Sequence, residues 1–549
     1  MIKKFLPVAT LMISLAACKN NSTNSDSGKS SGDSETEKTE LTKKMSKRDL
    51  SITAANAYSS LFLDSLEMEK FFLNNKVNDT LIRRMRSFYN SRNYQYAWFS
   101  EDGITEQGRG FWNMFQYYDK SDKEVSADAD LKKSMNKLVM QEELTVSPTD
   151  KKILNTELNL SKHFIQFSLQ SIDEGYIKRK EMERFVPQKK NDAIAYADSL
   201  VNKKHKDEKY YGDVNPAYAA LLAQTKNYLA VAQQGGFVGL TANAKSYAKT
   251  ATGENIIKLK KRLQQSGLIG VEDSSTAFTP ALTTAVMNAQ ESFGYTPNGV
   301  VTESLLKDLN VPVEKRIQQL LINLNRMQWS INKVTDRMMM VNIPEFVLHV
   351  KEGGKDVMKM NVVVGKDGHN TMIFTGDMNQ GVFAPYWNIP EEIKQKEILP
   401  AIAKNPNYLE EKNMEKVGDL IRQKPGPNNS LGKVKFLFPN SFDIYFHDTN
   451  AKDLFNKDKR AFSHGCIRLA EPEKLANYVL RGQPEWTPEK ITIAMNQETE
   501  QQVRIDKPIF VLITYYTAWV DDQGRLNFRE DIYGHDKNVA SKMFTSPLL

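Results

Sequence analysis

Cysteine is scarce in this sequence of 549 residues, which contains only Cys18 and Cys466. Two cysteines cannot form the disulfide framework of small secreted domains. The apolar run near the N-terminus ends at about residue 17 and falls short of the ~20 residues that a permanent membrane-spanning helix needs. Basic and acidic residues nearly balance, at 74 and 67, and the resulting net charge of +7 is too small to indicate nucleic-acid binding.

The N-terminal stretch MIKKFLPVATLMISLAACKN has two lysines, an apolar core and small residues, which is typical of an export signal. Its end, Leu15-Ala16-Ala17-Cys18, resembles a bacterial lipobox and implies that Cys18 becomes the lipidated first residue of the mature chain. An ordinary signal peptide cut near Ala17 is the alternative. If Cys18 carries lipid, Cys466 has no intramolecular partner, and reactivity is the leading explanation for a lone thiol in an exported chain.

Length and periodicity predict a multidomain α+β protein, because about 530 mature residues exceed what one core holds. Helical spacing dominates the first half, and a small three-helix bundle is indicated where Thr279 and Pro280 start a helix and Gly267 ends one. From Met338 onward, apolar and alternating runs predict a largely β domain. A charged insertion with a helical pattern interrupts it and is a candidate lid. The predicted boundaries are 1–17 signal peptide, 18–48 disordered tether, 49–250 helical scaffold, 251–312 three-helix bundle, 313–336 connecting helix, 337–520 β domain with the lid at about 390–432, and 521–549 C-terminal extension.

The stretches IYFHDT and AFSHGCIRL place His447 at the end of a predicted strand, 19 positions before Cys466. A thiol of ordinary pKa is only a few per cent ionised at neutral pH, and a neighbouring imidazole that accepts its proton activates it. His464 lies on the same turn as the cysteine and is poorly placed to reach the sulfur, so His447 is the candidate base. Gly465 allows close backbone approach for an oxyanion hole, and Arg468 suits a substrate carboxylate. On residue types alone, a structural histidine, a structural ion pair and a zinc site remain alternatives, although zinc lacks a second cysteine or a two-histidine helix spacing.

The same two stretches, with the blocks VFAPYWNIPEEIKQKEILP and TYYTAWVDDQGRLNFREDIYG, resemble the large, periplasm-facing members of the L,D-transpeptidase family. The 253–310 segment is similar to a peptidoglycan-binding helical module, with a docking bundle lacking glycan affinity as the alternative. The resemblance covers roughly residues 70–540. One departure is the stretch NTMIF at 370–374, where many relatives have a proline after the threonine.

The resemblance implies a cysteine thioester mechanism that forms 3→3 cross-links between peptidoglycan stem peptides, with carbapenems as expected inhibitors and with no metal or cofactor. It implies a periplasmic protein anchored through Cys18 to the inner or the outer membrane, with no nucleic-acid partner and no expectation about oligomeric state. An L,D-carboxypeptidase, a D-amino-acid exchange enzyme and a non-catalytic binding scaffold remain alternatives. The expected site residues are Cys466 as nucleophile, His447 as general base and acid, Gly465 for the oxyanion, the Asp448 backbone to orient His447, and Arg468, His464, Ser463, Tyr386 and Trp387 to bind the substrate.

Overall fold

The computed structural model describes residues 45–119, 129–141, 144–173, 185–202, 216–270, 275–331 and 336–549. The predicted signal peptide, Cys18 and most of the predicted tether lie outside these ranges. The last residues of the predicted tether are already attached to the fold, because Ser46 and Arg48 hydrogen bond with Ser87 and Asn93. In the described part of the chain, no helix has both the length and the apolar character needed to cross a bilayer.

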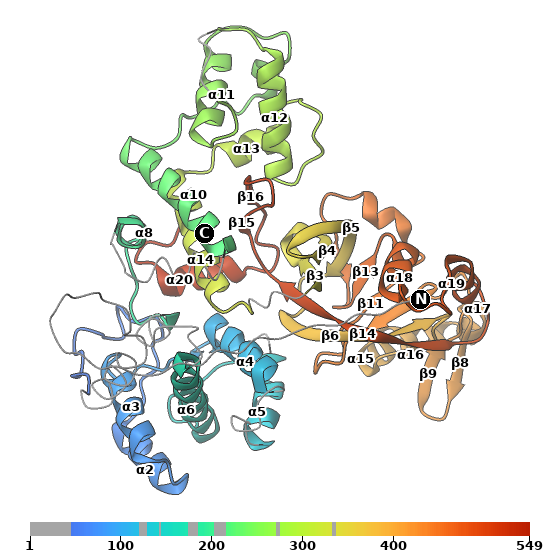
Figure 1. The fold of residues 1–549 in the computed structure, drawn as a ribbon, viewed down its shortest axis with the longest axis horizontal. Coiled ribbons are helices and arrows are strands. Elements are labelled where there is room, and N and C mark those ends of the chain that lie inside the picture. The colour runs from blue at the N-terminus through green and yellow to red at the C-terminus, as the bar shows by residue number, and fades with distance from the viewer. Residues whose placement is uncertain are drawn as a thin grey trace, which may run out of the picture.

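The N-terminal region is helical, as predicted; its helices up to residue 173 lie at the lower left of Figure 1, and its last two helices lie above them. Its core is aromatic: Trp98 stacks on Phe111 with ring centroids 5.2 Å apart, and Phe164 packs edge-on against both. A buried carboxylate, Glu157, accepts hydrogen bonds from the backbone N–H groups of Ala97 and Trp98. Its elements are α2 (Ser65–Asn74), α3 (Asp79–Asn90), β1 (Phe99–Ser100), β2 (Gly103–Ile104), α4 (Glu106–Asp119), α5 (Ala129–Val139), α6 (Lys151–Asp173), α8 (Ala193–Asn202) and α10 (Pro216–Gln233).

The small bundle stands at the top of Figure 1 and consists of η2 (Ala244–Tyr247), α11 (Glu254–Gln265), α12 (Pro280–Ser292) and α13 (Glu303–Leu309). Its helix ends follow the sequence signals. The Thr279 hydroxyl accepts from the Leu282 N–H, and Gly267 follows α11 in the left-handed conformation at φ +71°.

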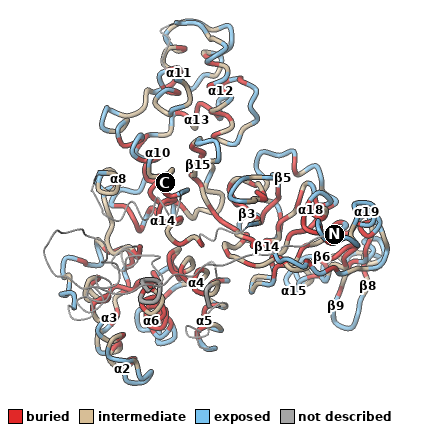
Figure 2. Tube along the Cα trace, in the orientation of Figure 1, coloured by how far each residue is buried: buried red, intermediate tan, exposed pale blue. Residues whose placement is uncertain are grey.

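Helix α14 (Val313–Gln328) connects the parts, and most of its residues are buried (Figure 2). Arg326 near its end pairs with Glu106 of α4 at 2.8 Å and with Asp536 of the C-terminal helix α20 (His535–Met543) at 2.5 Å. One buried guanidinium therefore holds the scaffold, the connecting helix and the C-terminus together. The remaining C-terminal elements are β15 (Ala518–Val520) and β16 (Leu526–Phe528).

The C-terminal half is mostly β, as predicted. Its strands form one sheet in the order β12-β5-β13-β11-β10-β6-β14-β3-β4, and a further pairing of β4 with β5 closes the sheet on itself. Buried aliphatic and aromatic side chains fill its interior. The strands are β3 (Arg337–Asn342), β4 (Val347–Glu352), β5 (Lys355–Gly365), β6 (Phe374–Phe383), β10 (Val434–Leu437), β11 (Phe446–His447), β12 (Ala461–Ser463), β13 (Ile467–Leu469) and β14 (Gln501–Thr514), with η3 (Ile343–Glu345), η5 (Lys452–Asn456), α18 (Pro472–Leu480) and α19 (Pro488–Met495) between them.

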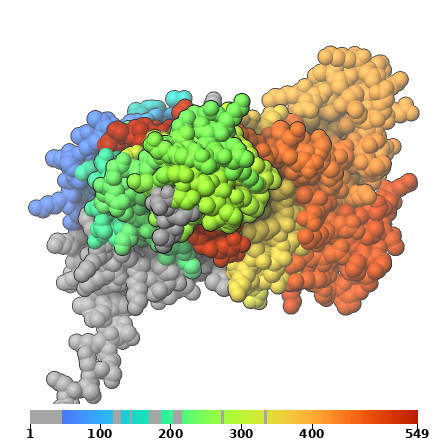
Figure 3. Space-filling view, turned by 90° about the horizontal axis from the view of Figure 1, so that it is seen from above, coloured from blue at the N-terminus to red at the C-terminus, as the bar shows by residue number. Residues whose placement is uncertain are grey.

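The predicted lid stands out from the body of this domain (Figure 3, light orange). Only the first half of the lid is helical. Its second half is a β-hairpin, in which Gly418, at φ +60°, and Asp419 form the tight turn between the two strands. A small apolar core of its own holds it together: Ile389, Ile398, Met414 and Ile421. Its elements are β7 (Trp387–Asn388), α15 (Glu391–Ile393), the π-turn η4 (Lys394–Ile398), α16 (Leu399–Lys404), α17 (Tyr408–Glu411), β8 (Met414–Val417) and β9 (Leu420–Gln423).

Candidate active site

Two short parallel strands carry the candidate site. In β11 and β13, Phe446 pairs with Ile467, and His447 pairs with Arg468. Side chains alternate along a strand, and Phe446 and Ile467 are fully buried in the core. The opposite face therefore receives four polar side chains: Tyr445, His447, Cys466 and Arg468.

The imidazole of His447 is buried and held in one tautomer. Its Nδ1 donates to the Asp448 carbonyl at 2.5 Å, which leaves Nε2 as an acceptor. Burial lowers the pKa of His447 to about 3, and the charge of Arg468 adds to this effect. His447 is therefore neutral at pH 7, the form that a general base requires.

Asp448 is itself fixed by its surroundings. Its carboxylate accepts from the backbone N–H of Lys433 at 2.8 Å and of Thr449 at 2.7 Å, and pairs with Lys452 at 2.5 Å. Gly432 lies so close that an added Cβ would stand 2.3 Å from the Asp448 carboxyl carbon. The carbonyl that orients His447 thus belongs to a tightly packed residue.

The Cys466 thiol is half-buried and donates to the Asp443 carbonyl at 3.6 Å. Burial raises the pKa of Cys466 to about 11, and hydrogen bonds from Tyr445 oppose this rise. At pH 7 the Cys466 thiol and the His447 imidazole on this face are therefore both neutral. In a nucleophilic reaction of this thiol, deprotonation would have to accompany the attack.

The polar groups of the turn before Cys466 hydrogen bond with one another. The Ser463 hydroxyl donates to the Cys466 carbonyl at 2.6 Å and accepts from the Gly465 N–H at 3.2 Å. Gly465 has φ +109°, and its carbonyl accepts from the Thr371 hydroxyl at 2.7 Å. Ser463 is thus buried and holds the turn, and the Gly465 N–H is engaged within it; the substrate contact of Ser463 and the oxyanion role of Gly465 stay predictions.

His464 points away from the cysteine toward the lid. Its Nε2 lies 3.1 Å from the Glu397 carboxylate in η4, and its ring meets that of His369 edge-on at 4.9 Å. His464 therefore joins the turn before Cys466 to the lid, and His447 stays the predicted base.

Tyr386 and Trp387 lie where the chain enters the lid. The Arg422 guanidinium covers the Tyr386 ring at 4.0 Å, and Trp387 packs against the apolar core of the lid. The Tyr386 carbonyl accepts from Lys435 at 3.3 Å. Lys435 pairs with His447 across β10 and β11, so its side chain lies on the same face as the site.

Arg468 is partly buried, and burial lowers its pKa. Its Nε–H has no hydrogen-bond partner among the described residues. A guanidinium with an unused edge beside the thiol suits a carboxylate or carbonyl of a bound substrate.

Reasoning from the sequence missed two residues of this face. Tyr445 lies two positions before His447, and Lys435 lies in the alternating run KVKFLF. In each case the period of two that brings a side chain to the same face was the available signal.

Comparisons with known proteins fit this arrangement. Residues 336–493 match the family model of the L,D-transpeptidase catalytic domain, residues 83–224 match a scaffold domain, and residues 252–309 match a "putative peptidoglycan binding domain". The chain is 30% identical over 222 residues to a Haemophilus influenzae protein named "putative L,D-transpeptidase"; the match covers 36% of this chain and 44%, less than half, of that relative.

Solved structures with similar parts include an L,D-transpeptidase from Mycobacterium smegmatis and one from Stackebrandtia nassauensis. The first is 12% identical with a TM-score of 0.19 and covers 33% of this chain and 58% of its own. The second is 14% identical with a TM-score of 0.20 and covers 48% of this chain and 91% of its own. At these values the likeness carries no argument about the present chain.

Proposed function

We propose that the protein cross-links peptidoglycan stem peptides through a cysteine thioester, because residues 336–493 match the family model of the L,D-transpeptidase catalytic domain. One observation carries the proposal: the Cys466 thiol shares a strand face with His447, whose Nδ1 is engaged and whose Nε2 is left as an acceptor. A thiol and an imidazole with an acceptor nitrogen on one face support the assignment of Cys466 as nucleophile and His447 as its base.

In the first half of the reaction, Cys466 Sγ attacks the carbonyl of the third stem residue, at the L-centre of a diamino acid. His447 Nε2 takes the thiol proton as the C–S bond forms, then gives it to the nitrogen of the leaving D-Ala as the C–N bond breaks. We assign the oxyanion to the Cys466 N–H and the Tyr445 hydroxyl, in place of the occupied Gly465 N–H. Arg468 would bind the carboxylate of the departing D-Ala.

In the second half, the side-chain amine of another stem attacks the thioester and forms the 3→3 cross-link. Its proton passes to His447 and then to the leaving Cys466 sulfur, which regenerates the thiol. We propose that the lid, linked to the catalytic turn through His464 and Glu397, closes over the substrate and favours the amine over water. Tyr386 and Trp387 would then contact the stem from the root of the lid.

We further propose that residues 49–250 act as the scaffold, residues 251–312 as a peptidoglycan-binding module and residues 337–520 as the catalytic domain. Lipidated Cys18 would anchor the protein to a membrane of the cell envelope. Metabolic labelling with an alkynyl fatty acid tests the anchor, and Cys18→Ala should abolish the label.

An acyl-enzyme experiment tests the chemistry. The full chain is mixed with a tetrapeptide stem whose diamino-acid amine is acetylated, so that the stem can serve as donor and not as acceptor. Intact mass should rise by the stem minus one D-Ala, on the peptide that contains Cys466, and Cys466→Ala should show no adduct.

The enzyme is an L,D-carboxypeptidase if it instead releases acetylated tripeptide quickly and if an added stem with a free amine yields no cross-linked product. Product that contains an added free D-amino acid would assign the exchange activity. Folded protein that forms neither adduct nor product would reject catalysis.

A further inference from the structure

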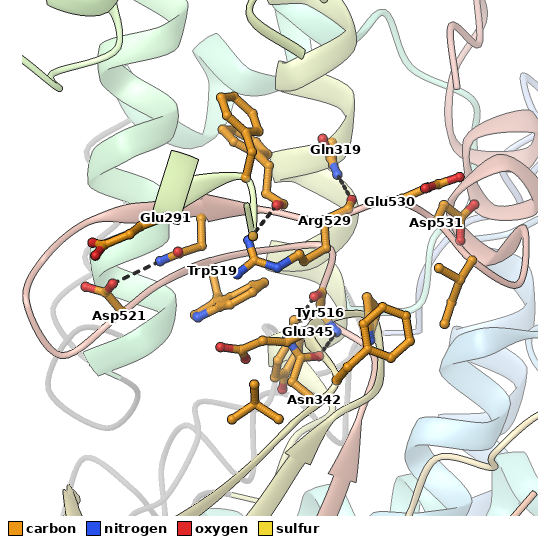
Figure 4. Close-up of a pocket in the computed structure, with 18 of the residues that line it drawn as sticks. Glu291, Gln319, Asn342, Glu345, Tyr516, Trp519, Asp521, Arg529, Glu530 and Asp531 are labelled. Carbon is orange, nitrogen blue, oxygen red and sulfur yellow. Dashed lines mark hydrogen bonds between the residues drawn. The ribbon is translucent and has the colours of Figure 1, made fainter. Parts of the chain in front are cut away.

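A large cleft lies away from the candidate active site, where three parts of the chain meet. Its volume is about 1060 Å³. One wall is the end of α12 and the turn after it, the second is the β3–β4 hairpin with η3, and the third is the β15–β16 hairpin with the segment that follows (Figure 4).

The three walls are bonded to one another, and Lys351 of the β3–β4 hairpin pairs with Asp522 of the β15–β16 hairpin at 3.2 Å. Arg525 pairs with Glu291 of the small bundle, and Arg529 donates to the Ser292 carbonyl at 2.9 Å. Gln319 of α14 donates to the Arg529 carbonyl at 3.1 Å. The cleft is therefore a built feature of the assembled chain and belongs to no single domain.

The charges that line the cleft nearly balance, because nine lysines and arginines face ten aspartates and glutamates. His349 lies 3.1 Å from both the Glu345 and the Asp356 carboxylates. Lys351 and Lys359 pair with Asp356 at 3.0 and 2.9 Å. A phosphate or nucleic-acid site needs a surplus of cationic groups, and the cleft as a whole has none. A polar ligand with little charge fits it better.

An aromatic platform stands opposite the wall of the β3–β4 hairpin. Trp519 is partly exposed, and the Arg529 guanidinium lies over its ring at 5.0 Å (Figure 4). Two cleft residues, Arg316 and Arg460, have buried Nε–H groups that lack a hydrogen-bond partner within the described ranges. An indole face, fixed carboxylates and unused donors together suit a saccharide, which offers apolar C–H faces and many hydroxyl groups.

The cleft also has a useful position. Lys359 in its wall and Val363 lie on the same face of β5, and Val363 pairs with Arg468 of the candidate active site. Four residues of strand span about 13 Å. A saccharide chain held in the cleft could therefore present an attached stem peptide to Cys466.

We infer that this composite cleft binds the glycan strand of peptidoglycan, so that the small bundle, the catalytic barrel and the C-terminal hairpin recognise it jointly. The identity of the glycan rests on the proposed function, whereas the preference for a saccharide rests on the cleft itself.

Fluorescence anisotropy tests the inference, with full chain in detergent and labelled glycan strands from which an amidase has removed the peptides. Trp519→Ala should weaken binding at least about tenfold, or ~1.4 kcal/mol. Trp486→Ala is the matched control, because this partly exposed tryptophan also has a cation over its ring, Lys490 at 4.9 Å, and lies outside the cleft. It should bind as wild type does, as should Cys466→Ala.

Trp519→Phe, which keeps a smaller aromatic face, covers the case in which the alanine variant does not fold, and should weaken binding by a smaller factor. Wild-type affinity for the glycan in a folded Trp519 variant would overturn the inference. Displacement of the labelled glycan by free tetrapeptide, but not by unlabelled glycan, would also overturn it. Glycan binding is measured without turnover, so failure of the proposed catalysis would leave this result unaffected. Failure of glycan binding would likewise leave the acyl-enzyme experiment unaffected.

Discussion

The resting state of the thiol gives a quantitative prediction. With a pKa of about 11 for Cys466, roughly one thiol in ten thousand is ionised at pH 7, against ~3% for an unperturbed cysteine. The ionised fraction is therefore about 300-fold smaller. A more basic thiolate is more nucleophilic, and a Brønsted slope of ~0.45 over about 2.5 pKa units recovers roughly a factor of ten. Alkylation of Cys466 by iodoacetamide at pH 7 should be about 30-fold slower than that of a free cysteine.

The pH profile tests the same reasoning. Only the thiolate reacts, so the alkylation rate should rise nearly tenfold per pH unit from pH 7 to about pH 10. Mass spectrometry of the peptide containing Cys466 measures this rate, and Cys466→Ser controls for labelling elsewhere. Because His447 is neutral in the resting protein, His447→Gln should change the rate at pH 9 by less than about threefold. A plateau near neutral pH that disappears in His447→Gln would reveal a thiolate–imidazolium pair and refute this account.

Three further outcomes follow from the structure. Thr371→Val removes the hydroxyl that supports the Gly465 carbonyl and should lower kcat about tenfold in steady-state assays with KM little changed, while Thr371→Ser should retain activity. Arg468→Gln should lower kcat/KM by about 10- to 100-fold for stems that end in a free carboxylate, and by much less for stems amidated there. Burial raises the pKa of Glu157 to about 7, above its unfolded value near 4.5. The folded state therefore holds the proton more tightly, and the free energy of unfolding should fall by about 3 kcal/mol as pH rises from 4.5 to 7. Urea titrations measure this fall, and Glu157→Gln should remove it.

The sequence predicted the fold class and named Cys466 and His447 as the candidate reactive residues, because both predictions depend on local signals. Helix caps at Thr279 and Gly267 and the alternation of strands are written in neighbouring residues. The pairing of a lone cysteine with His447 followed from residue chemistry and the family motif. Chain geometry then put both on one face of adjacent strands.

The hydrogen bonds of the turn before Cys466 could not be predicted in the same way. Whether Ser463 reaches a substrate or its own turn depends on the backbone angles around Gly465, which no motif specifies. The hairpin in the lid had a usable signal in Gly418, but the surrounding charge pattern favoured helix. The cleft beside Trp519 joins segments more than 200 positions apart, and only the folded chain brings them together.

The most direct test of the central claim is product analysis with an authentic substrate. The full chain is incubated with disaccharide tetrapeptide beside Cys466→Ala, and the products are identified by tandem mass spectrometry. The account predicts a dimer equal to two stems minus one D-Ala, joined through both third residues, from the wild type and none from the variant. A dimer in both samples, or none from folded wild-type protein, would contradict it.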